Sequence, residues 1–367
     1  MNSSRKQYRF LFAAGGTGGH LYPAVAVAEE IKKIKPESEI LFVGTKDRIE
    51  GRVIPKLGYK FKSIWIKGFA RKFNWSNLLF PFRLLISMFQ SLVISMKFKP
   101  KVAIGTGGYV AGPSIWAASV MGAKIILMES NSYPGITTRL LEHYADEVHL
   151  SFDISKKYLR RQNILKVTGN PVRENLGTIN KAEAKKNFGL DENKRTILVL
   201  GGSLGASSIN NVIEKSLNTV IENNLQMIWQ TGKDYYERYK KLNFAAVKIF
   251  DFLEDMNKAY SACDLLVARA GATTIAELTV LGLPAILIPS PNVAENHQYH
   301  NAKALVDKIA ALMIQDDELN SKLLETILSV INDSKKLEEL SFNAKSLAKP
   351  NAAREIALNA IKYAQTV

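Results

Sequence analysis

Residues 8–20 read YRFLFAAGGTGGH, an apolar run that ends in glycines and continues into a segment with helical spacing. The pattern returns at 102–109 (VAIGTGGY) and at 196–206 (TILVLGGSLGA). Glycine lets a chain turn tightly after a strand and approach a ligand closely, and the N–H groups of the following helix favour phosphate or sugar oxygens. Two such loops in the first half and one opening the second predict two nucleotide-binding folds facing each other across a cleft.

Apolar runs and amphipathic segments alternate along the 367 residues, which is typical of βαβ units and parallel sheets. Strands are predicted at 8–14, 39–43, 61–66, 101–105, 123–128, 147–150, 164–168, 196–200, 225–230, 246–250, 264–267 and 285–288. Helices are predicted at 21–34, 47–57, 76–97, 113–121, 135–144, 206–222, 234–241, 255–262, 273–281, 296–307 and across 316–365, with 177–194 as a surface linker carrying a short helix. The fold class is therefore α/β, with two doubly wound, Rossmann-like domains that bind ligands beyond the carboxyl ends of their strands.

The composition and the missing motifs exclude several classes of protein. The single Cys263 rules out a disulfide framework within the chain. Residues 1–7 lead into the first strand without an apolar leader, so we expect a cytoplasmic location. The sequence has no Walker motif and no GxSxG elbow, and its match to a dinucleotide-binding fingerprint is weak.

The net charge of +15 is concentrated in one part of the chain. Between Gly51 and Met128 there are twelve Lys or Arg residues and no Asp or Glu. Aromatic and aliphatic side chains are interleaved with these charges at 64–82. Such an asymmetry indicates an anionic partner.

A basic surface with embedded Trp and Phe is typical of proteins that lie on an anionic membrane. A nucleic-acid groove also uses basic and aromatic residues, and a core helix with a basic edge is the plainest alternative. The aliphatic content favours lipid, so we expect no nucleic-acid partner. The uncharged run 84–96 has thirteen residues, fewer than the about 20 that a spanning helix needs, so it should lie on a membrane or be buried.

Polar residues beside the glycine loops are candidates for chemistry. His20 opens the first helix, where a neutral imidazole could remove a proton from a hydroxyl group or could merely cap or pack the helix. The stretch 269–274 (RAGATT) offers N–H groups and hydroxyls to a diphosphate. Glu277 suits vicinal ribose hydroxyls, with a solvent-facing Glu as the alternative. His297 and His300 have no third ligand close by, so we expect no metal site.

Six motifs occur in an order that resembles one family: GGTGGH at 15–20, GTGGYVAGP at 105–113, GNPVR at 169–173, GGSLGA at 201–206, ARAGATTIAE at 268–277 and HQYHNA at 297–302. Over nearly its whole length the chain resembles the bacterial UDP-N-acetylglucosamine:N-acetylmuramyl-(pentapeptide) pyrophosphoryl-undecaprenol N-acetylglucosamine transferases, which convert lipid I to lipid II.

The resemblance implies a GT-B glycosyltransferase that inverts the anomeric centre and uses no metal or other cofactor. Its partners would be UDP-N-acetylglucosamine, lipid I and the anionic cytoplasmic surface of the bacterial cell membrane, on which the protein would be peripheral. Residues 1–168 would form the acceptor- and membrane-binding domain, 169–345 the UDP-sugar-binding domain, and 346–367 a helix that packs back on the first domain. The membrane patch would comprise Trp65, Phe69, Arg71, Lys72, Phe73, Trp75, Leu79 and Phe82.

The resemblance also implies roles for individual residues. His20 would be the general base for the 4-hydroxyl of the acceptor. Gly108, Tyr109 and Glu129 would bind the acceptor. Thr17, Gly18 and Gly19 would line the acceptor diphosphate site with Gly108 and Tyr109 and would also contact the donor. The other donor contacts would be Asn131, Arg173, Ser203, Leu253 through its backbone, Thr273, Glu277 at the ribose and Gln298 at the sugar hydroxyls.

Two departures from the family pattern affect the donor side. Leu204 stands where the family usually has Gln, and His297 precedes Gln298 where a Gln-Gln pair is usual. Four other interpretations remain: a diacylglycerol sugar transferase, a UDP-N-acetylglucosamine epimerase, a dinucleotide oxidoreductase, and a non-catalytic membrane scaffold.

Overall fold

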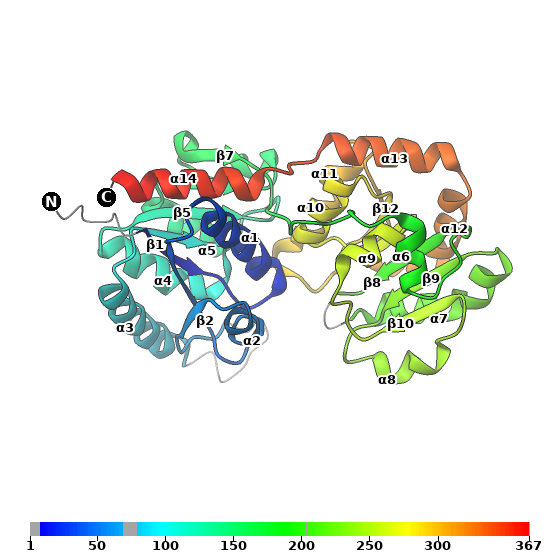
Figure 1. The fold of residues 1–367 in the computed structure, drawn as a ribbon, viewed down its shortest axis with the longest axis horizontal. Helices are drawn as coiled ribbons and strands as arrows, with labels where there is room; N and C mark the ends of the chain where they lie inside the picture. The colour runs from blue at the N-terminus through cyan, green and yellow to red at the C-terminus, as the bar shows by residue number, and fades with distance from the viewer. Residues whose placement is uncertain (1–7, 69–78, 203–204, 367) are drawn as a thin grey trace. The chain divides into compact units, whose positions relative to one another are not determined.

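The computed structural model describes residues 8–68, 79–202 and 205–366. The chain forms two compact units, one of residues 1–173 and 349–367 and the other of residues 174–348 (Figure 1). The chain therefore leaves the first unit after Arg173 and returns to it at Lys349.

The first unit contains a seven-stranded parallel sheet in the order β3-β2-β1-β4-β5-β6-β7. The order reverses between β1 and β4, which places the carboxyl ends of these two strands at the switch point of a doubly wound sheet. The strands are β1 (Arg9–Ala13), β2 (Glu39–Gly44), β3 (Lys60–Ser63), β4 (Val102–Gly105), β5 (Lys124–Glu129), β6 (Glu147–Leu150) and β7 (Leu165–Val167).

Apolar side chains cover both faces of this sheet. Phe12 and Phe42 stack on neighbouring strands with ring centroids 5.0 Å apart. On their face, Ile356 and Ile361 of the last helix join the same core. The helices are α1 (Gly18–Ile34), α2 (Ile49–Lys56), α3 (Phe80–Phe98), α4 (Gly108–Val120), α5 (Ile136–Leu141) and α14 (Ala352–Thr366).

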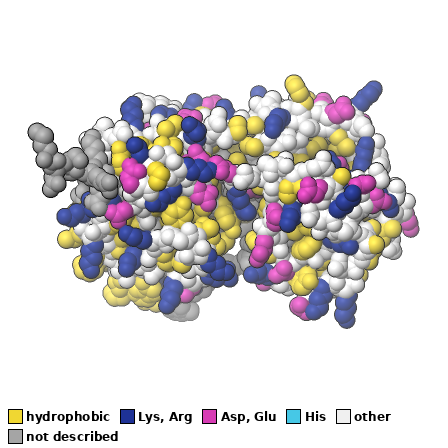
Figure 2. Space-filling view, in the orientation of Figure 1, with side chains coloured by type: hydrophobic (Ala, Val, Ile, Leu, Met, Phe, Trp, Pro, Cys, Tyr) yellow, Lys and Arg dark blue, Asp and Glu magenta, His cyan; other side chains and the backbone are white. Residues whose placement is uncertain are grey.

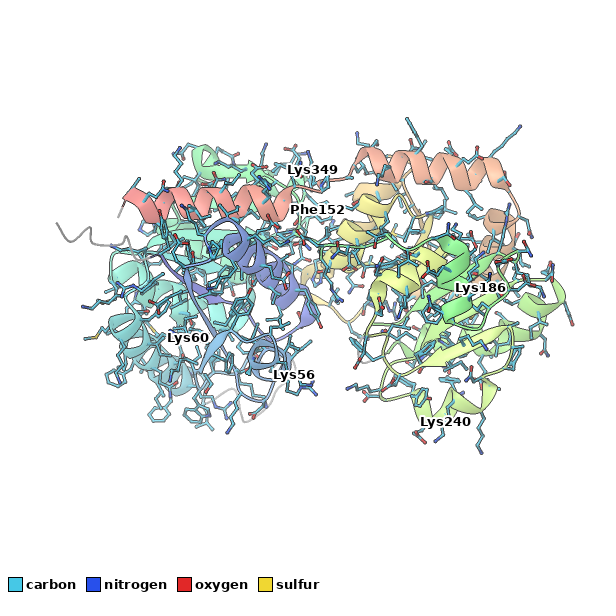
Figure 3. All side chains as sticks on the ribbon, in the orientation of Figure 1. Lys56, Lys60, Phe152, Lys186, Lys240 and Lys349 are labelled. Carbon is cyan, nitrogen blue, oxygen red and sulfur yellow. The ribbon has the colours of Figure 1, made fainter. Side chains whose placement is uncertain are left out.

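The return of the chain to the first unit is a close crossing of two backbones. Gly169 has φ of 91°, and a β-carbon built on it would lie 2.3 Å from Cβ of Lys349. Lys349 is labelled in Figure 3, just before α14 begins. From there α14 runs back over the first unit and packs against α1, β4 and β5 (Figure 1).

The second unit contains a six-stranded parallel sheet in the order β10-β9-β8-β11-β12-β13, with its switch point between β8 and β11. Its strands are β8 (Thr196–Leu200), β9 (Gln226–Gln230), β10 (Val247–Phe250), β11 (Leu265–Arg269), β12 (Ala285–Ile288) and β13 (Leu312–Met313). Its helices are α6 (Lys181–Asn187), α7 (Ser207–Glu222), α8 (Tyr236–Tyr239), α9 (Met256–Ala262), α10 (Ala272–Leu281), α11 (His297–Val306), α12 (Leu319–Ile331) and α13 (Ser334–Ser346).

The predicted α/β class with two doubly wound parallel sheets is confirmed, and three local predictions differ from the structure. The helix predicted at 113–121 begins at Gly108, because the glycines and Pro113 are accommodated in its first two turns. The two-residue strand β13 was not predicted. Within 177–194, α6 packs against α9 and buries Lys185, whose ammonium pairs with Asp264 at 3.2 Å, so this segment is more than a surface linker.

Candidate active site

In the first unit, the loops that follow β1 and β4 lie side by side, because these strands are neighbours in the sheet. Gly107 and Gly108 have φ of 92° and 72°, a backbone region that favours glycine. A β-carbon on Gly108 would lie 3.0 Å from the carbonyl oxygen of Gly15. Glycine therefore lets the two loops touch, and α1 and α4 begin beside them.

His20 lies in the first turn of α1 with its ring against the second of these loops. A β-carbon on Gly107 would lie 3.1 Å from Cε1 of the ring and 3.2 Å from Nδ1. The residue as a whole is partly exposed, but Nδ1 is buried and has no hydrogen-bond partner among the described residues. The backbone carbonyl of His20 accepts a 2.8 Å hydrogen bond from the Thr106 hydroxyl, which joins the helix to the loop.

Burial lowers the pKa of the His20 imidazole below its usual 6.5, while a hydrogen bond to the Thr106 backbone and the negative charge of Glu50 act in the opposite direction. A histidine with a lowered pKa is neutral near pH 7, where it can accept a proton. Both the position and the protonation state of His20 therefore suit a general base.

Glu50 lies directly beneath the first glycine loop, and no motif in the sequence singles it out. It is in the first turn of α2 and is fully buried. Its Oε2 accepts the N–H of Gly16 at 3.1 Å, and its Oε1 accepts the N–H and the hydroxyl of Thr45 at 2.9 and 2.7 Å. A β-carbon on Gly15 would lie 2.5 Å from Oε1, so glycine at this position makes room for the carboxylate.

Tyr109, in the first turn of α4, packs over the first loop: a β-carbon on Gly16 would lie 3.4 Å from Cε1 of its ring. Thr17 is exposed at the start of α1, and Gly18 and Gly19 form the first turn of that helix. The structure therefore gathers the predicted loop residues, together with Tyr109 and His20, at one edge of the first sheet.

Glu129, at the end of β5, organises the loop that follows it. Its Oε1 accepts the N–H of Asn131 at 2.9 Å and the Asn131 side-chain amide at 3.3 Å. Its Oε2 accepts the N–H of Gly135 at 3.0 Å and the Thr138 hydroxyl at 2.6 Å. Burial raises the pKa of this carboxyl, and the four hydrogen bonds act against that rise. In this structure both carboxylate oxygens hold residues of the protein itself, so the side chain fixes the position of Asn131.

Arg173, the last residue of GNPVR, is tied to the helix that carries His20. Its guanidinium lies 4.1 Å from the ring centroid of Tyr22, a cation–π contact. Asn170 of the same motif is buried, and its Oδ1 accepts the Ser130 hydroxyl at 3.0 Å. This motif is therefore anchored both to α1 and to the loop after β5.

In the second unit, a buried amide holds the glycine loop that follows β8. Gln230, at the end of β9, donates from Nε2 to the carbonyl of Gly202 at 3.1 Å and accepts the N–H of Leu253 on Oε1 at 2.9 Å. Sequence reasoning missed Gln230, although it predicted Leu253 as a backbone contact. The N–H of Leu253 is engaged by Gln230 in this structure. The predicted site residue Ser203 and the departure Leu204 lie outside the described residues.

Arg269, at the end of β11, joins three segments at the same edge of the second sheet. Its guanidinium donates to Asp316 Oδ1 at 2.5 Å and to the Ser208 hydroxyl at 2.8 Å. It also donates to the carbonyl of Pro289 at 3.2 Å. With its charge balanced by Asp316, Arg269 fixes the loop that leads into α10, where Thr273 lies partly exposed in the first turn. The N-terminus of this helix suits an anionic ligand.

Glu277 is buried, so the alternative of a solvent-facing side chain is wrong. Its Oε2 accepts the Tyr260 hydroxyl at 2.8 Å, a partner that sequence reasoning missed because Tyr260 lies inside an ordinary helical segment. Gln298, in the first turn of α11, accepts the N–H of Ser290 on Oε1 at 2.9 Å. Glu277 follows β11 and Gln298 follows β12, and these two strands are neighbours in the second sheet.

The described part of the predicted membrane patch is exposed: Trp65, Leu79 and Phe82 are each about half accessible. Arg83 lies over the Trp65 ring at 5.5 Å. The remaining predicted patch residues lie outside the described residues, namely Phe69, Arg71, Lys72, Phe73 and Trp75.

Helix α3 reverses the usual amphipathic arrangement. Its buried face consists of serines, Ser87, Ser91 and Ser95, and it packs against α4. Its outer face carries Leu85 and Phe89, which are 66% and 69% exposed. In Figure 2, hydrophobic side chains interspersed with Lys and Arg cover the region of the first unit where Figure 1 shows α3.

Within residues 8–68, 79–202 and 205–366, no helix has the length and apolar character that spanning a membrane requires. No group of three His, Cys, Asp or Glu side chains in these ranges is arranged to hold a metal ion.

Known proteins match both units. Residues 10–150 match the glycosyltransferase family 28 N-terminal domain, and residues 196–356 match the family 28 C-terminal domain. A UDP-N-acetylglucosamine--N-acetylmuramyl-(pentapeptide) pyrophosphoryl-undecaprenol N-acetylglucosamine transferase from Flavobacterium psychrophilum is 43% identical over 364 residues, which are 98% of this chain and 99% of the relative.

Two solved structures show the same architecture. MurG of Acinetobacter baumannii has a TM-score of 0.74 and 26% identity, covering 97% of this chain and 99% of that one. The UDP-GlcNAc 2-epimerase from Neisseria meningitidis bound to UDP-GlcNAc has a TM-score of 0.68 and 15% identity, covering 97% of this chain and 100% of that one. The second likeness shows the fold alone, so the fold does not by itself separate transferases from epimerases.

Proposed function

This chain belongs to glycosyltransferase family 28, and from that membership we infer that it is a UDP-sugar-dependent glycosyltransferase with a GT-B fold. Within the family it belongs with the UDP-N-acetylglucosamine--N-acetylmuramyl-(pentapeptide) pyrophosphoryl-undecaprenol N-acetylglucosamine transferases. Its reaction moves N-acetylglucosamine from UDP-N-acetylglucosamine to the 4-hydroxyl of the N-acetylmuramyl unit of lipid I. The products are lipid II and UDP, and the step belongs to peptidoglycan biosynthesis.

The observation that carries this function is the full-length match to a relative of that name, at 43% identity over 98% of the chain. The family motifs are not scattered over the fold. GGTGGH and GTGGYVAGP lie at the switch point of the first sheet, and ARAGATTIAE and the described residues of GGSLGA (201, 202, 205 and 206) lie at that of the second. Ligands of doubly wound sheets bind at these points.

On the acceptor side, His20 is proposed to act as general base. In a single displacement, the acceptor oxygen forms a bond to the anomeric carbon as the bond from that carbon to the UDP oxygen breaks, and the electron pair leaves with UDP. The hydroxyl proton passes to the neutral imidazole of His20. Gly108 and Tyr109 are proposed to line the acceptor site, and Glu129 is proposed to act there by holding Asn131 and the loop after β5.

On the donor side, the N-terminus of α10 with Thr273 is proposed to bind the diphosphate of UDP, where its N–H groups stabilise the charge that develops on the leaving group. Glu277 is proposed to accept hydrogen bonds from the ribose, and Gln298 to read the sugar hydroxyls. The remaining proposed donor contacts are Thr17, Gly18, Gly19, Asn131, Arg173, Ser203 and the Leu253 backbone.

The protein is proposed to be peripheral on the cytoplasmic face of the cell membrane, where its lipid-linked acceptor lies. What supports this is α3, which directs Leu85 and Phe89 outward and its serines inward. Arg83 and Lys97 on this helix, with Lys99 just after it, supply positive charge beside the apolar face. Apolar insertion and attraction to anionic headgroups add to each other in interfacial binding.

The function is tested with a panel of purified donors and acceptors in which UDP release is followed. We expect release that depends on both UDP-N-acetylglucosamine and a short-chain lipid I analogue, and no release with diacylglycerol. Release with diacylglycerol but not with lipid I would assign the chain to the glycolipid transferases. Conversion of the donor to its 2-epimer without any acceptor, either still linked to UDP or released from UDP by water, would assign it to the epimerases.

A further inference from the structure

The buried carboxylate of Glu50 has no role in the site described so far. An ionised carboxylate is removed from water only where donors or charges compensate it. Glu50 accepts three hydrogen bonds, from the N–H of Gly16 and from the N–H and hydroxyl of Thr45. Its partners therefore include the glycine loop that leads into the helix of His20.

The packing from Glu50 to His20 is continuous. Oε1 of Glu50 fills the space beside Gly15 that a β-carbon would need. The carbonyl oxygen of Gly15 contacts Gly108, and the preceding glycine, Gly107, contacts the His20 ring. The carboxylate and the imidazole thus both contact the pair of touching loops, Glu50 at Gly15 and His20 at Gly107 and Gly108.

Glu50 is also the acidic side chain whose charge acts on His20 among the described residues. Among the described residues, the ionisable groups near the two glycine loops also include Tyr22 on α1, Tyr109 on α4, Arg173, which lies over the Tyr22 ring, and Glu129 at the end of β5. The charge of Glu50 favours proton transfer to His20, because a negative charge near a base stabilises the imidazolium that forms when the base takes up a proton.

We propose that Glu50 is a positioning residue for His20, one that fixes the first glycine loop and stabilises the imidazolium formed in the transfer. The proposal rests on the proposed function for the source of the proton, which is the acceptor 4-hydroxyl. His20 gains that proton and a positive charge as the new glycosidic bond forms and UDP departs. In this proposal Glu50 acts only through the glycine loop and through its charge, and it contacts neither substrate.

The main test is Glu50→Gln, which keeps the size of the side chain and removes its charge. The variant should lower kcat by about 10-fold, less than the roughly 10²–10⁴-fold that a positioned base contributes in full. The KM for UDP-N-acetylglucosamine should stay unchanged. Without the negative charge the pKa of His20 falls further, so the acid limb of the kcat–pH profile should move to lower pH. A fall in kcat with the limb unmoved, or an unchanged kcat, would overturn the proposal.

Glu30→Gln is the matched control, because Glu30 is a mostly buried carboxylate of the same unit that lies on α1 and pairs with Lys33 at 3.2 Å. It should retain the kcat and the pH profile of the unaltered chain. If neither the unaltered chain nor this control transfers the sugar, the proposed function is wrong.

The role of Glu50 can also be measured without substrate, by NMR titration of the His20 imidazole. The pKa of His20 should be lower in Glu50→Gln than in the unaltered chain, and equal values would reject the proposal.

A second variant covers the case in which Glu50→Gln does not fold. Glu50→Asp keeps the charge but draws it back by one methylene from Gly16 and His20. The acid limb of its kcat–pH profile should lie between the limb of the unaltered chain and the limb of a chain without the charge. Thermal unfolding should show that the variant is folded. A folded Glu50→Asp variant with an unshifted profile and an unshifted His20 pKa would contradict the proposal.

Discussion

The ring of His20 lies directly against the backbone of Gly107, so that a β-carbon at residue 107 would approach Cε1 to 3.1 Å. The contact joins the helix after β1 to the loop after β4, two segments separated by more than eighty residues of sequence. The position of the candidate base is therefore set by a residue with no side chain.

Gly107→Ala should damage both stability and activity. The φ of 92° with ψ of −170° disfavours alanine, at about 1–3 kcal/mol, and the new methyl group would push the ring of His20 out of place. We expect a lower midpoint in thermal unfolding and a kcat that falls more than the donor affinity does. Gly112→Ala is the control. Gly112 lies on α4, and a β-carbon built on it would meet no atom within 4 Å beyond the backbone of its own helix, so this variant should retain activity. Equal behaviour of the two variants would argue against the contact.

His20→Ala should lower kcat by roughly 10²–10⁴-fold, the contribution of a positioned general base, with little change in the KM for the donor. Because burial lowers the pKa of His20, the acid limb of the unaltered protein should lie below pH 6.5, and activity should be lost as the pH falls and the ring becomes protonated. The limb should be absent from the variant. A KM effect without a kcat effect would remove the catalytic role.

Glu277→Ala should weaken donor binding. Hydrogen bonds to a charged group contribute about 1.5–3 kcal/mol each, so the Kd for UDP-N-acetylglucosamine by calorimetry should rise by at least about 10-fold, with kcat at saturating donor nearly unchanged. Tyr260→Phe removes only the hydroxyl that donates to Glu277 at 2.8 Å and should show a smaller effect. A folded Glu277→Ala protein with unaltered Kd would refute the ribose assignment.

The double variant Phe82→Ser/Phe89→Ser should reduce binding to vesicles that contain phosphatidylglycerol. Each phenylalanine buried in the interface contributes about 1.5–3 kcal/mol, so flotation should show at least a 10-fold loss per residue. Transfer to a soluble acceptor analogue should not change. Phe342→Ser, on α13, removes a phenylalanine that is 75% exposed and should not affect vesicle binding. If both proteins bind equally well, α3 is not the contact surface.

The parallel sheets and their glycine loops were predictable because apolar runs, glycines and helical spacing are local signals. Glu50, Gln230 and Tyr260 were not, because each lies in an ordinary helix or strand and acquires its partner only when distant segments meet. Glu277 shows the limit within one helix: its spacing allowed a solvent-facing position, whereas in the fold the carboxylate is buried and accepts the hydroxyl of Tyr260 from α9. For α3 the composition indicated a membrane or core segment, and the inward serines resolve which side chains face outward.

The proposed function is tested most directly by transfer of labelled N-acetylglucosamine from its UDP donor to a short-chain lipid I analogue in the presence of EDTA. We predict one product, a disaccharide β-linked to the 4-position of the N-acetylmuramyl unit, formed at the same rate with and without the chelator. An α-linked product, a rate that EDTA abolishes, or no transfer to lipid I would contradict the proposed function.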